Sequence, residues 1–179
     1  MGENKALVEF EGRTLLDRAL ATLKEACGEV VIVGDPEIYG WYGRVVSDVF
    51  PNCGPLGGIH AALSQSPAEL NLMLAVDMPF VSAELLRFLF RKAGETNALV
   101  TVPRTSRGLQ PLCAVYRAVF ATIAEKAIRA GNYKIDAAFG GIAIHVVGEP
   151  ELRAAGFSER DFFNVNTPED RRTAADLNP

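Results

Sequence analysis

Short apolar runs alternate with amphipathic segments along the chain, and this alternation restricts the possible folds more than any other feature. Residues 14–26 place leucines and alanines on one face at helical spacing, with Thr14 in a capping position. The next run, Val30–Val33, is short and β-branched and ends at Gly34, which is typical of a strand buried in a parallel sheet. The repeating pattern predicts further strands at Arg44–Ser47, Leu70–Val76, Ala98–Val102, Leu112–Tyr116 and Ile142–Val147, and helices at 57–65, 82–93, 117–130 and 132–139. The sequence therefore predicts an α/β protein, a three-layer α/β/α sandwich around a mostly parallel, Rossmann-like sheet.

The length, charge and composition of the chain limit its possible domain organisation, binding partners and location. The chain has 179 residues without a linker or internal repeat, so we expect a single domain over residues 1–179. A net charge of −4 provides no general basic surface for nucleic acid. The sequence contains no apolar run of about eighteen residues and begins with a charged segment, so we expect no membrane association and a cytoplasmic location. Cys27, Cys53 and Cys113 lack metal-type spacing and are interpreted as reduced thiols.

Two aspartates follow predicted strands directly, at the edge where open α/β sheets bind their ligands. Asp77 comes after the strand at Leu70–Val76, and Asp48 follows the weaker strand before it. A carboxylate such as Asp77 can hold Mg²⁺, which prefers one or two carboxylates together with phosphate oxygens and water. The alternative is an aspartate that accepts hydrogen bonds from nearby backbone N–H groups and shapes a loop.

The segment after Asp48 is rich in glycine and proline. Residues 51–58 contain three glycines and two prolines, so we expect a loop whose backbone can approach a flat ligand closely. The predicted helix that follows would present its N-terminus to an anion. An ordinary tight connection is the alternative interpretation.

Polar residues near both ends of the chain are further candidates for ligand binding. Lys5 stands beside a short apolar run and can neutralise phosphate charge, or it can be a solvated surface lysine. Asn164 and Asn166 are two residues apart, so in an extended segment both amides share one face. They precede Thr167–Asp170, which predicts a helix start, and one asparagine could simply shape that turn.

Four segments, taken in order, resemble the molybdenum cofactor guanylyltransferases of the nucleotide-diphospho-sugar-transferase-like superfamily. They are Asn4–Leu7, Asp48 with Gly54–Ile59, Asp77–Phe80, and Asn164–Asp170. The stretches G-P-L-G-G-I and N-V-N-T-P-E-D are the specific part. The resemblance implies a nucleotidyltransferase fold and the transfer of GMP from GTP to molybdopterin, with Mg²⁺ as cofactor and pyrophosphate as product.

The resemblance also implies a role for each matching residue. Lys5 and Asp77 would be catalytic, with Lys5 on the nucleotide phosphates and Asp77 holding Mg²⁺ and touching GTP. Asp48 would lie in the guanine nucleotide pocket, and Asn164 and Asn166 on the pterin side. The segment that helps to select guanine would include Gly54, Pro55, Leu56 and Gly57. Implied protein partners are those that deliver molybdopterin and the molybdoenzymes that receive the product.

The resemblance to the family does not extend to the residues before Lys5. Family members open with a strand and a glycine-rich loop of the type L-A-G-G-x-S-x-R-M-G, which this sequence lacks. A start codon assigned too late or a truncated chain would explain this, as would a natural chain that has lost triphosphate binding. In either case we expect weak GTP binding, because backbone donors for the phosphates are missing, and unpaired sheet edges where the first strand would lie.

Two other functions remain open from the sequence. One is a nucleotidyltransferase that uses a different nucleotide or acceptor, such as the cytidylyltransferase of the same cofactor pathway. The other is a non-catalytic nucleotide-binding remnant. A panel of nucleotides in a pyrophosphate-release assay separates the first from a guanylyltransferase, and a thermal shift with GTP and Mg²⁺ addresses the second.

Overall fold

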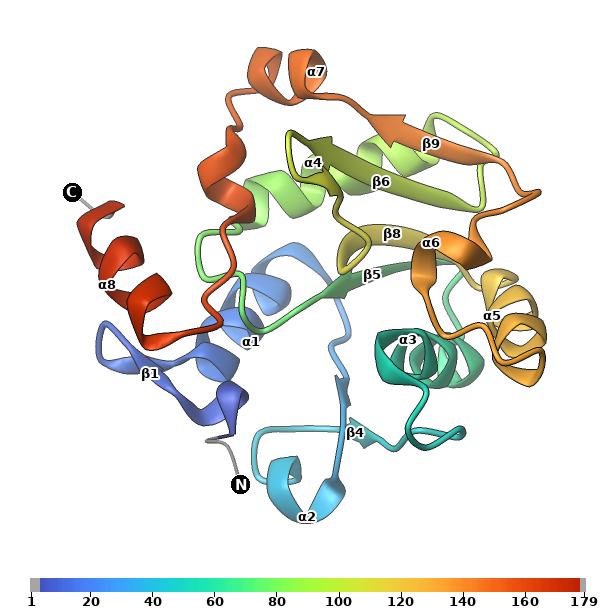
Figure 1. The fold of residues 1–179 in the computed structure, drawn as a ribbon, viewed down its shortest axis with the longest axis horizontal. Coiled ribbons are helices and arrows are strands. Elements are labelled where there is room, and N and C mark those ends of the chain that lie inside the picture. Colours follow the sequence, from blue (N-terminus) through green and yellow to red (C-terminus); the bar gives the residue numbers. More distant parts are fainter. Residues whose placement is uncertain (1–3, 178–179) are drawn as a thin grey trace.

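The computed structural model describes residues 4–177, in which helices cover both faces of a five-stranded sheet (Figure 1). In this sheet β8 lies between β5 and β6, and β6 also pairs with β9 and with the short β7. Two smaller ribbons, β1–β2 and β3–β4, lie outside it. The strands are β1 (Glu9–Phe10), β2 (Arg13–Thr14), β3 (Ile32–Val33), β4 (Val45–Val46), β5 (Leu70–Leu74), β6 (Val100–Thr105), β7 (Gly108–Leu109), β8 (Cys113–Arg117) and β9 (Ile144–Val147).

Two groups of helices form the outer layers. Apolar side chains of α3, α5 and α6 pack on one face of the sheet, while α4 and α7 pack on the other, where α1 lies beside α4. The helices are α1 (Leu15–Ala26), α2 (Pro36–Tyr39), α3 (Gly54–Gln65), α4 (Ala83–Gly94), α5 (Phe120–Arg129), α6 (Ile135–Ala138), α7 (Glu149–Ala154) and α8 (Pro168–Leu177), with 3-10 turns η1 (Lys5–Leu7) and η2 (Glu159–Phe162). The predicted three-layer α/β/α sandwich is confirmed.

Side-chain caps fix the starts of two long helices where the sequence predicts them. The Thr14 hydroxyl accepts a hydrogen bond from the backbone N–H of Asp17 at 3.0 Å, which begins α1. Ser82 accepts from the N–H of Leu85 at 3.2 Å and begins α4. Each cap satisfies a backbone donor that the first turn of a helix leaves without an intrahelical partner.

The prediction of a mostly parallel sheet is not confirmed. Strand β8 runs antiparallel to both β5 and β6, and β7 is also antiparallel to β6. The parallel pairs are β6–β9 and β3–β4. The physical reason lies in the connection: β6 turns back through Gly108, whose φ of +105° suits the turn, and a short connection can join antiparallel strands only.

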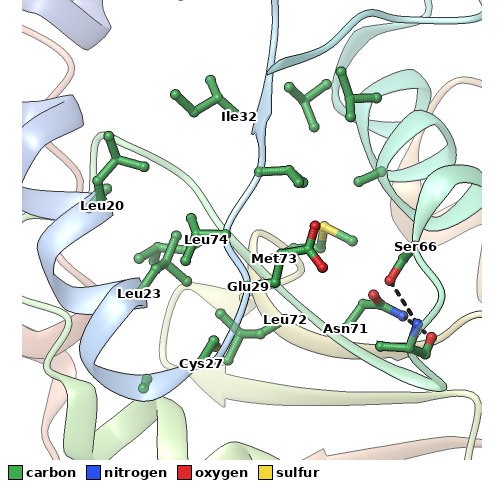
Figure 2. Close-up of a pocket in the computed structure, with 18 of the residues that line it drawn as sticks. Leu20, Leu23, Cys27, Glu29, Ile32, Ser66, Asn71, Leu72, Met73 and Leu74 are labelled. Carbon is green, nitrogen blue, oxygen red and sulfur yellow. Dashed lines mark hydrogen bonds between the residues drawn. The ribbon is translucent and has the colours of Figure 1, made fainter. Parts of the chain in front are cut away.

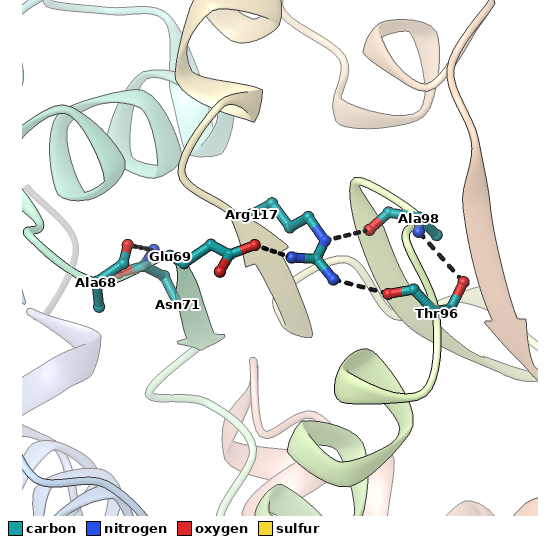
Figure 3. Close-up of polar contacts among 6 residues, drawn as sticks. All are labelled: Ala68, Glu69, Asn71, Thr96, Ala98 and Arg117. Atoms are coloured by element: carbon teal, nitrogen blue, oxygen red, sulfur yellow. Dashed lines mark hydrogen bonds and ion pairs between the residues drawn. The ribbon is translucent and has the colours of Figure 1, made fainter.

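Arg117 ties the end of β8 to the segments on either side of it (Figure 3). Its guanidinium donates to the backbone oxygens of Ala98 at 3.1 Å and Thr96 at 2.7 Å, just before β6. On the other side it pairs with the carboxylate of Glu69, just before β5. One side chain therefore fixes the relative position of three strands at this end of the sheet.

The β3–β4 ribbon is shorter than the sequence predicts. Hydrogen-bonded pairing is limited to Ile32–Val33 and Val45–Val46, although the apolar run begins at Val30. Within residues 4–177, β3 pairs with β4 and not with β5. The ribbon is thus separated from the five-stranded sheet, and a cavity lies between them.

Candidate active site

A lysine, an aspartate and an asparagine from three distant parts of the sequence meet beyond the carboxyl end of β5. The Lys5 ammonium donates to the Asn166 side-chain oxygen at 2.8 Å. The backbone N–H of Val165 donates to the backbone oxygen of Asp77 at 2.7 Å. These contacts bring together Lys5, Asp77 and the segment of Asn164 and Asn166, as we expect for residues that act on one ligand.

Local structure around Asn4 positions Lys5. The Asn4 side-chain oxygen accepts from the backbone N–H of Ala6 at 3.2 Å and so caps η1. The same oxygen accepts from the Tyr39 hydroxyl, in α2, at 3.0 Å. The side chain of Ala6 is buried while that of Lys5 is exposed, so the turn directs the ammonium away from the core.

Asp77 is half-buried, and burial raises the pKa of its carboxyl group. The positive charge of Lys5 lowers that pKa, but this effect is smaller than the effect of burial. An ionised Asp77 is therefore costly in the unliganded protein. A cation bound beside it would remove this cost, because a nearby positive charge favours the carboxylate.

Asp170 holds the segment around Asn166 in place. Its carboxylate accepts from the backbone N–H of Asn166 at 2.9 Å and of Thr167 at 2.8 Å, and Thr167 in turn accepts from the Asp170 N–H at 3.0 Å. Hydrogen bonds from the Asn166 backbone and the Thr167 side chain hold the pKa of Asp170 below its usual value. The helix start predicted at Thr167–Asp170 is confirmed, and it orients Asn166.

Replacing Asp170 by asparagine is expected to lower the melting temperature at neutral pH. The carboxylate has a lowered folded pKa, so its stabilisation is complete above its ordinary pKa and disappears as the pH falls through the lowered value. The wild-type and variant melting temperatures should therefore converge in acid. Thermal unfolding followed between about pH 3 and pH 7 checks this, and a difference that persists at low pH would contradict it.

The prediction of a loop over residues 51–58 is wrong from Gly54 onwards, because α3 begins there. Asn52 and Gly54 both have positive φ, of 63° and 60°, and these left-handed residues turn the chain into the helix. Proline is favourable in a first helical turn, so Pro55 fits there. The glycine-rich segment is therefore the N-terminal turn of a helix, whose free N–H groups favour an anion.

Members of the Gly54–Gly57 segment differ in what they can present to a ligand. Gly54 and Pro55 are exposed, whereas Leu56 is 0% exposed and packs in the core. A Cβ atom at Gly57 would lie 3.2 Å from the backbone oxygen of Phe50, so the backbone segments at these two residues lie close together. Of this segment, Leu56 could reach a ligand only through its backbone.

Asp48 is exposed and lies beside α3, near the carboxyl end of β4. A Cβ at Gly58 would lie 3.8 Å from the Asp48 carboxylate and 3.4 Å from the Val33 side chain. Asp48 thus stands on the side of the β3–β4 ribbon, whereas Asp77 follows β5. The two predicted nucleotide-binding aspartates belong to different sheets, and any shared ligand would have to extend between them.

Arg107 is a candidate that the sequence patterns did not indicate. It lies in the turn between β6 and β7, and its guanidinium stands 5.6 Å from the centre of the Phe163 ring. The neighbouring Ser106 hydroxyl donates to Glu159. The turn therefore contacts the segment that leads into Asn164, and only the three-dimensional structure brings these residues together.

The donor set at this site fits a cation that takes most of its ligands from a substrate and from water. Within residues 4–177 no group of three or more His, Cys, Asp or Glu side chains could enclose a metal ion. Asp77 offers one carboxylate and Asn166 an amide oxygen, which are hard oxygen donors. Such a set suits a divalent cation held jointly with phosphate oxygens, and it does not suit a closed structural site.

A cavity of about 800 Å³ opens beside this cluster, between β3 and β5, and Lys5 and Asp77 are among its lining residues. Apolar side chains dominate the view in Figure 2, including Leu20 and Leu23 of α1 and Leu72 and Leu74 of β5. Cys27 lines it as well and, like Cys53 and Cys113, is a free thiol.

Among the described helices, none has both the length and the apolar composition to cross a bilayer.

Comparison with known proteins relates this arrangement to a family of enzymes. Residues 1–141 match the family described as MobA-like NTP transferase domain. The probable molybdenum cofactor guanylyltransferase of Pelotomaculum thermopropionicum is 40% identical over 95% of this chain and 83% of its own length. The molybdenum cofactor guanylyltransferase of Desulfosudis oleivorans is 32% identical over 97% of this chain and 86% of its own.

Solved structures agree with the sequence matches. Molybdopterin-guanine dinucleotide biosynthesis protein A from Archaeoglobus fulgidus superposes with a TM-score of 0.84 and 26% identity, covering 98% of this chain and 91% of that one. A protein from Mycobacterium tuberculosis, solved as a complex with manganese, shares the fold with a TM-score of 0.65 and 15% identity, covering 96% and 91%. The sequence motifs, the three-layer fold and these matches together show that the chain belongs to the MobA-like nucleotidyltransferase family, the family of the molybdenum cofactor guanylyltransferases.

Proposed function

We propose that this protein transfers GMP from GTP to molybdopterin, forming the guanine dinucleotide form of the molybdenum cofactor and releasing pyrophosphate. The relatives named guanylyltransferases, up to 40% identical over most of the chain, support this pair of substrates. The structural observation that carries the proposal is the meeting of Lys5, Asp77 and Asn166 beyond β5, with a 2.8 Å hydrogen bond from Lys5 to Asn166. A cation and an oxygen-donor carboxylate beside one cavity suit a phosphate substrate.

The reaction needs no protein nucleophile. A terminal phosphate oxygen of molybdopterin forms a bond to the α-phosphorus of GTP, and the bond from that phosphorus to the bridging oxygen of pyrophosphate breaks. Lys5 would offset negative charge on the phosphates, and Asn164 and Asn166 would orient the pterin substrate. Asp77 would hold Mg²⁺, which would neutralise phosphate charge when bound.

The guanine base would lie on the side of the β3–β4 ribbon. Asp48 and the first turn of α3 stand there, and Gly54, Pro55, Leu56 and Gly57 would contribute backbone groups that can read a base edge. The nucleotide would then extend from Asp48 towards Lys5 and Asp77. The phosphates would then lie next to the pterin side, as the transfer requires.

Three free cysteines fit a reducing compartment, so we propose that the enzyme acts in the cytoplasm. Proteins that deliver molybdopterin and molybdoenzymes that receive the product are its proposed partners.

A nucleotide panel tests the proposed function. The purified chain is incubated with molybdopterin, Mg²⁺ and GTP, CTP or ATP in turn, and pyrophosphate release is measured. We expect turnover with GTP at a rate at least tenfold above that with CTP or ATP. Faster turnover with CTP would assign the cytidylyltransferase function. No turnover with any nucleotide, combined with a thermal shift on adding GTP and Mg²⁺, would leave a binding protein only.

A further inference from the structure

Hydrogen bonds fix the turn between β6 and β7 on both of its sides. The buried hydroxyl of Thr105 accepts from the backbone N–H of Arg107 at 3.2 Å and from the Gln110 side-chain amide at 3.1 Å. On the outer side of the turn, the Ser106 hydroxyl donates to the Glu159 carboxylate. The protein therefore determines where the backbone of Arg107 lies, although its side chain is exposed.

An aromatic surface orients the Arg107 side chain. Its guanidinium carbon lies 5.6 Å from the centre of the Phe163 ring. That ring is itself packed, since its centroid lies 6.3 Å from that of Phe80, which lies 5.9 Å from that of the buried Phe10. A guanidinium stacked on an aromatic face keeps the N–H groups at its edge available for other partners.

The charge of Arg107 has no ion-pair partner in the part of the chain that the structure describes. Within residues 4–177 its guanidinium forms neither a hydrogen bond nor an ion pair with a protein group. It acts through space on Asp170, whose pKa is lowered first by hydrogen bonds from Asn166 and Thr167 and also by the charge of Arg107. Since Asp170 bonds the Asn166 N–H at 2.9 Å, and the Asn166 side chain bonds Lys5, Arg107 is an oriented cation beside the candidate active site.

Two other arginines near the aromatic surface have different surroundings. Arg160 stacks on Phe80 at 5.3 Å, but it lines a separate pocket together with the Asp161 carboxylate. Arg18 lines the same pocket and forms an ion pair with Glu11 at 2.7 Å. Each of these two cations thus has a carboxylate close by, which leaves Arg107 as the candidate for binding an anionic substrate.

The proposed transfer brings two anions together. The triphosphate would lie at Lys5 and Asp77, and the attacking phosphate of the acceptor must approach its α-phosphorus to about 3–3.5 Å. A cation on the acceptor phosphate offsets the repulsion between the two groups. A guanidinium suits this position because its fork of N–H groups matches two phosphate oxygens.

We propose that Arg107 binds the terminal phosphate of the pterin acceptor, with two guanidinium N–H groups donating to two phosphate oxygens. Phe163 holds the guanidinium in the orientation that this pairing needs. Lys5 would carry the nucleotide phosphates, so each substrate has its own cation. The inference rests on the proposed function, because its ligand is the acceptor of that reaction, and it adds a residue that selects for a phosphorylated acceptor.

A comparison of two proteins with two ligands tests this role. Wild type and Arg107→Met are dialysed to equilibrium, without nucleotide and without oxygen, against molybdopterin or against molybdopterin whose terminal phosphate has been removed. Methionine keeps an apolar contact with Phe163 but carries no charge. We expect Arg107→Met to bind molybdopterin at least about tenfold more weakly than the wild type, as is usual for the loss of a charged hydrogen bond. Both proteins should bind the dephosphorylated ligand equally well.

Arg104→Met is the matched control, because it removes an exposed arginine from the same hairpin. It should bind both ligands as the wild type does, and both variants should keep the wild-type melting temperature, since both positions are exposed. Wild-type affinity of Arg107→Met for molybdopterin would overturn the inference. An equal loss for both ligands would do so as well, because Arg107 would then contact the pterin rings, and so would an equal loss in Arg104→Met. If the wild type binds neither ligand, the proposed function itself fails and the inference fails with it.

Discussion

Replacing Asp77 by asparagine is expected to lower the rate of GTP-dependent pyrophosphate release by at least about a hundredfold, the usual cost of removing one electrostatic partner of a reacting group. The substitution keeps the shape of the side chain but removes the charge that would hold the cation. Steady-state assays at several Mg²⁺ concentrations measure the effect. A rate close to that of the wild type would exclude the metal-binding role of Asp77.

The same substitution is expected to stabilise the protein in the absence of metal. The folded pKa of Asp77 is raised by burial, so stability that is present below its ordinary pKa is lost as the pH rises through the raised value. Asparagine does not ionise and avoids this loss. The melting temperature of the variant should therefore exceed that of the wild type at neutral pH, and the two should converge in acid. Asp136→Asn, at an exposed position in α6, is the control for the change in charge.

Phe120→Ala is expected to destabilise the fold by about 3–5 kcal/mol, the range for a buried aromatic residue replaced by alanine. The Phe120 side chain is 0% exposed, and its ring lies 5.0 Å from that of Tyr116 and 6.0 Å from that of Phe139, between centroids. These contacts join α5 to β8 and to the end of α6, so the substitution leaves a cavity shared by three elements.

The adjacent residue provides the control. Val119 is 56% exposed, so Val119→Ala should change the free energy of unfolding by no more than about 0.5 kcal/mol. Chemical denaturation of both variants measures the difference. If Phe120→Ala and Val119→Ala lower the free energy of unfolding by the same amount, the buried contacts of Phe120 do not stabilise the sheet.

Features set by neighbouring residues could be predicted from the sequence. Thr14 and Ser82 begin helices because each side chain bonds a backbone donor three residues later, and this preference is local. The direction of β8 could not be predicted in this way, because an apolar strand has the same pattern whether its neighbours are parallel or antiparallel. The glycines and prolines at 51–58 suggested a loop, although α3 begins at Gly54 and Leu56 is buried in its first turn.

The candidate site was predicted through motifs and not through geometry. Lys5 and Asn166 are 161 positions apart, and neither residue alone indicates that the other bonds to it. The family resemblance associated them, and their 2.8 Å contact agrees with that association. No motif pointed to Arg107, whose place beside Phe163 depends on how the β6–β7 turn meets the carboxyl-terminal segment.

The hydrogen bond between Lys5 and Asn166 has a consequence for biosynthesis. Since translation proceeds from the amino end, a nascent chain can pair β5, β8 and β6 before the ribosome has released Asn166. During that interval the lysine has no amide partner, and the asparagine segment is absent from the end of β5. Catalytic competence would therefore arise only after Asn166 has been synthesised, so a chain arrested before that residue would remain inactive even with these strands paired.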